Sequence, residues 1–217
     1  MLVNPKKHVL SKPFITENGK MINKGVVAYE EYGNKDGPVI YILHGAFSQF
    51  HAAGKYNESD SVPGFWNSII GPMKAIDTNL FRVIAANSPG SMFGSSSPLS
   101  IHPETGKRYG LDFPEISIID MVNFHKTFLD EIGIKKIFMI AGPSMGAMQS
   151  LQMAALYPDF VESVFATATA AYLPALAQAM HSFMIEMIRS DSEYNQGNYK
   201  ENTTLSCMKN FTLFCKF

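Results

Sequence analysis

Cysteine and formal charge are both scarce in this chain of 217 residues. Cys207 and Cys215 are its only cysteines, and no histidine cluster lies near them. We therefore expect neither a disulfide framework nor a metal site. Charged residues make up 17% of the chain and the formal net charge is −1, which disfavours nucleic acid as a ligand. Apolar residues make up 46%, a share that argues against disorder.

The sequence also lacks an obvious targeting or membrane segment. Its first residues, MLVNPKKHVLSKPF, contain two lysines but no apolar run behind them, so we expect no secretory signal and a cytoplasmic protein. Residues 137–158 and 163–185 carry no formal charge, yet both contain Ser, Gln and Pro. We interpret them as buried strand and helix pairs and not as membrane spans. The length is typical of one α/β domain.

Alternating strand and helix patterns predict an α/β fold with a mostly parallel sheet and crossover helices. Residues 26–33 and 38–44 are β-rich runs on either side of a turn, and we expect them to pair as an antiparallel hairpin at the edge of the sheet. The further predicted strands are residues 81–87, 137–141 and 163–167, and the predicted helices are residues 116–132, 145–157 and 172–189.

A long segment rich in Pro, Gly and Ser, residues 87–114, connects the predicted strand 81–87 to the next helix. Segments of this length inside a compact domain are usually functional or mobile. It contains a run of three serines, Ser95 to Ser97. Because no lysine-terminated glycine-rich loop accompanies the run, we interpret it as loop filler and not as a phosphate-binding site.

The strongest functional motif is Gly142-Pro143-Ser144-Met145-Gly146, which lies between a predicted strand and a predicted helix. A strand, a sharp turn and a helix around G-x-S-x-G are typical of a nucleophile elbow, in which strain exposes the serine hydroxyl. Small residues at the flanking positions let the strand and helix pack closely. We therefore predict that Ser144 is a nucleophile. The alternative is a surface turn whose serine only caps the helix.

Two backbone N–H groups are candidates for an oxyanion hole. That of Met145 opens the helix after the nucleophile, where the helix dipole also favours negative charge. The second candidate is Ala46, in the loop that follows the strand ending at His44. We interpret His44 as a hydrogen-bonded core histidine because it precedes the serine, whereas a catalytic histidine follows it in this class of enzyme.

The acid and base of a catalytic triad are not apparent after Ser144. His181 is the only later histidine and falls inside a predicted helix, without room for further strands before it. Asp159 indicates a surface turn, and Asp191 follows His181 in the wrong order. We assign none of the three to a triad.

Several segments resemble the homoserine O-acetyltransferase branch of the α/β-hydrolase superfamily. They are HGAFSQFHAAG, FWNSIIGPMKAIDTNLFRVIAANS, IHPETGKRYGLDFPEISIIDMV and AGPSMGAMQSLQMAALYPDFVESV, within a similarity that covers residues 26–200. The resemblance implies an α/β-hydrolase core over residues 1–170 and the start of a helical lid over 171–200. It also implies a serine acyltransferase of methionine biosynthesis that has no bound cofactor and is a homodimer in the family.

By this resemblance, Ser144 would take an acyl group from acetyl-CoA or another acyl-CoA and pass it to an alcohol acceptor in a ping-pong reaction, while Met145 and Ala46 hold the oxyanion. The family usually has an arginine in the first lid helix to bind the acceptor's carboxylate. Here Tyr172 and Ile185 stand in the corresponding register, and no arginine lies between Arg108 and Arg189. A different acceptor, or an esterase using water, is therefore an alternative.

The resemblance ends near Lys200, and residues 201–217 do not continue the lid pattern. We interpret these residues as a divergent tail and the chain as C-terminally truncated, with the late strands and the triad Asp and His missing. A nucleophile without its base would lose on the order of 10⁴ to 10⁶ in kcat. Besides an acyltransferase and an esterase, a third hypothesis is therefore a non-catalytic relic with an unfinished sheet edge.

Overall fold

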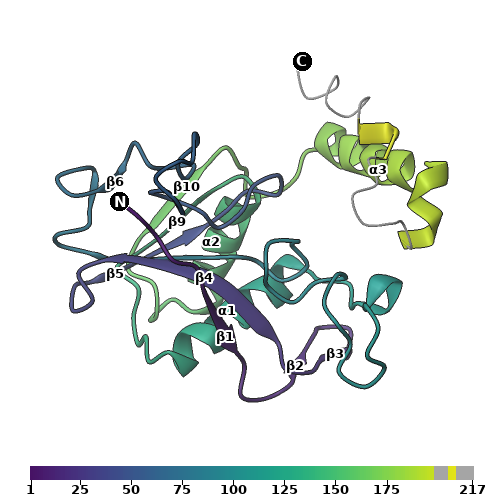
Figure 1. Ribbon diagram of the computed structural model, residues 1–217, viewed down its shortest axis with the longest axis horizontal. Helices are drawn as coiled ribbons and strands as arrows, with labels where there is room; N and C mark the ends of the chain where they lie inside the picture. Colours follow the sequence, from purple (N-terminus) through teal and green to yellow (C-terminus); the bar gives the residue numbers. More distant parts are fainter. Residues whose placement is uncertain (198–204, 209–217) are drawn as a thin grey trace. The chain divides into compact units, whose positions relative to one another are not determined.

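The computed structural model describes residues 1–197 and 205–208 (Figure 1). The chain forms two compact units, one of residues 1–109 and 113–169, the other of residues 110–112 and 170–217. Most of the predicted tail at residues 201–217 lies outside the described residues, as does Cys215.

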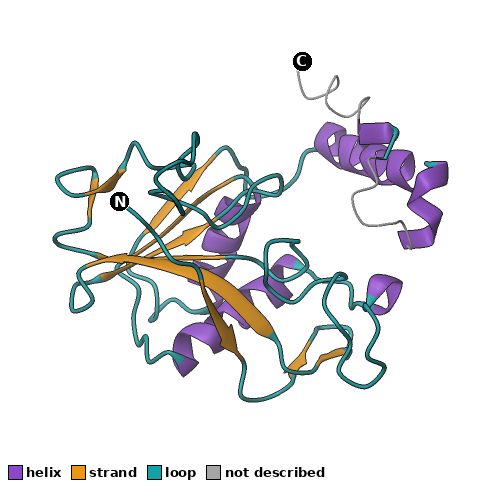
Figure 2. Ribbon diagram, in the orientation of Figure 1, coloured by secondary structure: helices purple, strands orange, loops and turns teal. Residues whose placement is uncertain are grey.

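The first unit is built on a six-stranded sheet with the order β1-β4-β8-β5-β9-β10 (Figure 2). Its inner strands β8, β5 and β9 are parallel, and β10 continues them in parallel at one edge. The strands are β1 (Lys6–Val9), β4 (Val26–Gly33), β5 (Val39–Leu43), β8 (Arg82–Ala86), β9 (Met139–Pro143) and β10 (Val164–Thr167). The predicted mostly parallel α/β sheet is confirmed.

The predicted hairpin of residues 26–33 and 38–44 is wrong, although both segments are strands. β8 lies between them, antiparallel to β4 and parallel to β5. β4 is not an edge strand either, because β1 pairs with its other side. β5 is buried at every position. It therefore gains more by lying between two strands in the middle of the sheet than by pairing with its sequence neighbour near the edge.

Two predicted helices cover one face of this sheet. α1 (Ile118–Glu131) begins at a capping box, in which the Ser117 side chain accepts a hydrogen bond from the Asp120 N–H and the Asp120 carboxylate accepts one from the Ser117 N–H. α2 (Met145–Leu156) follows β9 directly and ends before Pro158. Both helices agree with the predicted ranges to within two residues.

Alternate residues of the central strands supply two separate cores. Tyr41, Leu43, Ile84 and Ile140 pack with α1 residues such as Phe124 and Phe128 in one cluster. Their neighbours on the strands, including Ile40, Ile42 and Val83, belong to the second. This alternation follows from the two-residue period of a strand, and it explains why the central strands are apolar throughout.

The second core is covered by a segment with little regular structure instead of a helix. Ala52, Ala53, Ile70 and Ile76 bury their side chains against this face of the sheet. The segment contains the short parallel pair β6 (Ile70–Gly71) and β7 (Ile76–Asp77). A second small pair, β2 (Phe14–Ile15) and β3 (Met21–Ile22), lies earlier in the chain.

The second unit contains the third predicted helix, α3 (Ala175–Arg189), whose N-cap is Pro174. No α3 residue is buried, although the helix carries the large apolar side chains Leu176, Phe183 and Ile185. Two short 3₁₀ turns, η1 (Gly110–Asp112) and η2 (Ser192–Gly197), belong to the same unit. None of the helices in the described ranges is long and apolar enough to cross a membrane.

The serine run in the long segment is part of the sheet's hydrogen bonding, so its interpretation as filler is wrong. Ser95, Ser96 and Ser97 are all buried. Beyond the end of β8, the Ser96 hydroxyl accepts a hydrogen bond from the Val26 N–H at 2.8 Å, and the Ser95 hydroxyl accepts one from the Ala28 N–H at 3.0 Å. These hydroxyls satisfy backbone donors of β4 that lie beyond the last residue paired with β8.

Candidate active site

Ser144 stands at the sharp turn between β9 and α2. Its φ of 53° and ψ of −120° place a residue that has a Cβ in a sparsely populated region of conformational space. The side chain is exposed although Gly142 and Gly146 on either side are buried. It makes no capping hydrogen bond to α2, so the alternative of a serine that merely caps the helix does not describe this residue.

The two glycines of the motif are required by close packing against β5. A Cβ added to Gly146 would lie 2.3 Å from the carbonyl oxygen of Leu43, and one added to Gly142 would lie 2.5 Å from the same oxygen. Neither glycine has a positive φ, so the requirement is steric. The carboxyl end of β5 and the start of α2 are therefore brought together at the nucleophile.

The loop after β5 passes directly beside Ser144. A Cβ built on Gly45 would lie 3.7 Å from the Cβ of Ser144. The next residue, Ala46, is exposed, and a turn closes behind it through the Ser48 N–H, which donates to the Gly45 carbonyl at 3.1 Å. In the described part of the chain, the backbone N–H groups of Ala46 and Met145 donate to no other residue. Both predicted oxyanion donors are thus free to bind a ligand.

His44 is buried and held by two hydrogen bonds, as expected of a core histidine. Its Nε2 accepts from the backbone N–H of Ser88 at 3.1 Å, and its Nδ1 contacts the Gly45 carbonyl at 2.8 Å. Because the carbonyl can only accept, Nδ1 carries the proton and the ring is neutral. Burial lowers the pKa of His44, partly offset by the bond to Gly45.

A buried polar network extends from Ser88 beneath the nucleophile. The Ser88 hydroxyl lies 3.1 Å from the side-chain nitrogen of Gln149 in α2 and 3.5 Å from Nε2 of His125 in α1. Nδ1 of His125 lies 2.7 Å from the hydroxyl of Tyr41 in β5. Burial, with a contribution from nearby His44, lowers the pKa of His125 to about 3. The network therefore joins β5, α1, α2 and the loop after β8 without a formal charge.

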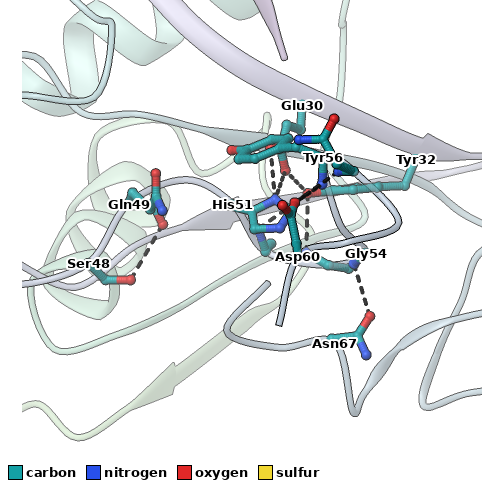
Figure 3. Close-up of polar contacts among 12 residues, drawn as sticks. Glu30, Tyr32, Ser48, Gln49, His51, Gly54, Tyr56, Asp60 and Asn67 are labelled. Carbon is teal, nitrogen blue, oxygen red and sulfur yellow. Dashed lines mark hydrogen bonds and ion pairs between the residues drawn. The ribbon is translucent and has the colours of Figure 1, made fainter. Parts of the chain in front are cut away.

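The far end of the loop after β5 is anchored by a second polar cluster, shown in Figure 3. The Tyr32 hydroxyl accepts hydrogen bonds from the backbone N–H groups of Ala52 and Ala53, each at 3.2 Å, and donates one to Glu30. Glu30 is fully buried, and Nδ1 of His51 lies 3.0 Å from its carboxylate. Burial and the neighbouring Glu30 raise the pKa of Tyr32.

This cluster and the first network were not predicted from the sequence. A signal for the network was present, because Gln149 and His125 stand at positions that face the core among apolar neighbours in α2 and α1. Such residues need buried partners. The identity of those partners, up to 84 residues apart for Tyr41 and His125, follows only from the fold.

A cavity of about 410 Å³ opens beside the nucleophile turn, and all of its lining residues belong to the first unit. Ala46 and Met145 both line it, so the two predicted oxyanion donors share one cavity with Ser88 of the buried network. The remaining walls come from the long segment after β8 and from the start of α1. This volume is within the usual range for small-molecule sites.

The described residues place no imidazole on the Ser144 hydroxyl. His44 and His125 are occupied in the buried network, and His51 pairs with Glu30. His181 lies in α3 with Nδ1 2.7 Å from the Ala177 carbonyl of its own helix. The structure thus presents an elbow and two free N–H donors, without a general base in contact with the serine.

This fold and site match a known family. The family with the alpha/beta hydrolase fold matches residues 38–207. The homoserine O-acetyltransferase of Nautilia profundicola is 42% identical over 203 residues, which are 92% of this chain and 55% of that protein. That of Methanosalsum zhilinae is 41% identical over 91% of this chain and 41% of its own length. The chain spans about half the length of these curated relatives.

Solved structures of a homoserine O-acetyltransferase and of an esterase are both similar to this chain. The crystal structure of homoserine O-acetyltransferase from Bacillus anthracis has a TM-score of 0.88 and 33% identity, over 98% of this chain and 58% of that one. Esterase E22 has a TM-score of 0.82 and 39% identity, over 92% of this chain and 56% of its own.

The strand order, the elbow and these matches establish that the chain belongs to the alpha/beta hydrolase fold family. Within that family it is a homoserine O-acetyltransferase-like protein.

Proposed function

We propose that the site transfers an acyl group through a covalent ester on Ser144. The observation that carries the proposal is the strained, exposed serine at the elbow. A positive φ at a residue other than glycine costs stability, about 1 to 3 kcal/mol, and such strain persists mainly where function requires it. In this conformation the hydroxyl makes no capping hydrogen bond to α2.

The proposed reaction has two steps. The Ser144 hydroxyl attacks the carbonyl carbon of an acyl-CoA thioester and releases its proton to the solvent, and the C–S bond breaks so that the CoA thiolate leaves and an acyl-enzyme remains. The hydroxyl of an alcohol acceptor then attacks the ester, takes the acyl group and restores the serine. The free N–H groups of Ala46 and Met145, together with the N-terminal dipole of α2, would stabilise the oxyanion in both steps.

Acyl-CoA as donor and an alcohol as acceptor are supported by the likeness to homoserine O-acetyltransferases. Because no imidazole contacts Ser144 in the described residues, we expect slow acylation, on the order of 10⁴ to 10⁶ below that of a complete triad. The oxyanion donors alone should still supply a measurable advantage over the uncatalysed reaction.

The test is to incubate the chain with acetyl-CoA, to measure CoA release, and to locate the acetyl group by peptide mass spectrometry. We expect one acetyl group on Ser144, which is absent in Ser144→Ala. Ser61→Ala, which changes another exposed serine, should be acetylated as the unaltered chain is. Acetylation that survives Ser144→Ala, or none in the unaltered chain over hours, would contradict the proposal. If the rate of acetyl-CoA hydrolysis does not change when alcohols are added, water is the acceptor.

A further inference from the structure

The cavity beside the nucleophile turn has mostly apolar walls. Phe93, Phe113, Ile116 and Met121 contribute apolar side chains to it. No lysine, arginine, histidine, aspartate or glutamate lines it. The hydroxyl of Ser88, one of its few polar side-chain groups, is already hydrogen-bonded to Gln149. A charged group placed against these apolar walls would lose part of its hydration and gain no ion partner, so the cavity disfavours charged ligands.

The apolar walls lie next to the two backbone N–H groups that would bind the reacting carbonyl. Ala46 and Met145 line it together, and their free N–H groups fix where an ester carbonyl would sit. An acyl carbonyl bound by these two donors has its alkyl group directed either to solvent or into the cavity. The apolar walls favour the cavity, because each buried methylene gains free energy.

The volume of the cavity favours a longer acyl group over a short one. An acetyl group adds a single methyl to the carbonyl and would leave most of about 410 Å³ unfilled. Unfilled apolar space forgoes packing contacts that a longer chain would make. The cavity therefore suits an acyl chain of several carbons.

We propose that this cavity is an acyl pocket that selects uncharged acyl groups longer than acetyl. The inference rests on the proposed function of Ser144 and adds the substrate class to it. Each methylene added to the acyl chain should raise the rate of Ser144 acylation about fourfold until the pocket is filled. A succinyl group, with its terminal carboxylate, should react more slowly than the uncharged butanoyl group of the same chain length.

The test uses p-nitrophenyl acetate, butanoate, hexanoate and mono-succinate. In each reaction the Ser144 oxygen bonds to the acyl carbon, nitrophenolate leaves, and the serine proton goes to the buffer. The rate of nitrophenolate release, less that of Ser144→Ala, gives the acylation rate. We expect hexanoate to exceed butanoate, butanoate to exceed acetate, and succinate to be slower than butanoate. Acetate as the fastest ester, or succinate equal to butanoate, would overturn the proposal.

Met121→Trp provides the structural control, because Met121 lines the pocket and is half-buried in α1. The larger side chain should remove the advantage of hexanoate over acetate. Ile118→Trp is the matched variant: Ile118 is also half-buried in α1 but does not line the pocket. It should keep the full dependence on chain length. Retention of that dependence in Met121→Trp would count against the pocket.

A binding measurement separates failure of the pocket from failure of the proposed function. If no ester acylates Ser144, the acyl-transfer proposal fails. Ligand binding can still be measured by titrating hexanamide into protein that carries ¹³C-methyl methionine. The Met121 methyl NMR signal, assigned by its loss in Met121→Leu, should shift saturably with hexanamide and much less with acetamide. An unchanged Met121 signal would overturn the acyl pocket as well.

Discussion

The backbone N–H of Ser88 donates a hydrogen bond to Nε2 of His44, at 3.1 Å. This one bond joins the ends of β8 and β5, the two strands whose following loops build the cavity and the candidate oxyanion hole. It also leaves Nδ1 of His44 to bind the Gly45 carbonyl, the residue before Ala46. His44 thus orients the site while it remains outside the proposed chemistry.

Replacing His44 should therefore destabilise the protein. His44→Ala leaves the Ser88 N–H and the Gly45 carbonyl without partners in a buried region, at a cost of about 2 kcal/mol or more. Urea unfolding followed by circular dichroism measures the loss. His181→Ala, at an exposed position of α3, should change the free energy of unfolding by less than about 0.5 kcal/mol. Equal stability of the two variants would show that the His44 bonds contribute nothing.

The buried histidines predict sensitivity to acid. The pKa of His125 is lowered to about 3 by burial and by nearby His44, whereas an unfolded histidine titrates near 6.5. Between these values the unfolded chain binds the proton and the folded chain does not, so stability is full above about pH 6.5 and is lost as the pH falls. His125 contributes a slope of up to about 1.4 kcal/mol per pH unit.

Unfolding midpoints in urea at pH 7, 6, 5 and 4 test this dependence. His125→Asn should be less stable than the unaltered chain at pH 7, because it loses part of the contact with Ser88 and Tyr41. Its stability should nevertheless fall less steeply below pH 6.5. An identical slope in both proteins would mean that His125 is not the group that titrates.

Backbone strain at Ser144 should lower the free energy of unfolding by an amount that substitutions can measure. Ser144→Gly replaces a residue with a φ of 53° by one that adopts positive φ readily, so we expect it to be more stable than Ser144→Ala by about 1 kcal/mol. Both variants should fail to form the acyl-enzyme. The comparison with alanine removes the effect of losing the hydroxyl. A glycine variant no more stable than the alanine variant would show that the elbow is relaxed.

The cluster of Tyr32 and Glu30 should hold the far end of the loop after β5. Tyr32→Phe removes the acceptor of the Ala52 and Ala53 N–H groups and the donor to buried Glu30, which predicts a loss of about 2 to 4 kcal/mol. Tyr29→Phe, on the same strand, is the matched control, because the Tyr29 ring packs on Phe128 and its hydroxyl has no hydrogen-bond partner among the described residues. Chemical denaturation of both variants gives the comparison.

Features set by local sequence could be predicted, and features set by distant pairing could not. The elbow was predictable because β9, the glycines and α2 are contiguous, so the pattern of apolar and small residues specifies the turn. The place of β8 between β4 and β5 was not, because strand order is decided after the chain has folded back over dozens of residues. The predicted hairpin failed for that reason.

The same distinction applies within the site. Ser144, Met145 and Ala46 follow from the motif and from the loop after a buried strand. Ser95 and Ser96 looked like filler because serine in a loop usually hydrogen-bonds locally or to water. Their actual partners, Ala28 and Val26, lie 67 and 70 residues away. Hydrogen bonds of this kind can be assigned only once the strand that carries the partner groups has been located in the fold.

The Ser95 hydroxyl also donates to the Asn87 carbonyl at 2.6 Å, and so closes the intervening segment into a ring attached to β4. The tip of this ring contributes Met92 and Phe93 to the cavity wall, and both side chains are more than 40% exposed. Residues 91–93 can therefore be exchanged for tips of other length or bulk while the hydrogen bonds of Ser95 and Ser96 to β4 remain intact. The wall of the proposed acyl pocket and the stability of the fold can thus be varied separately at this loop.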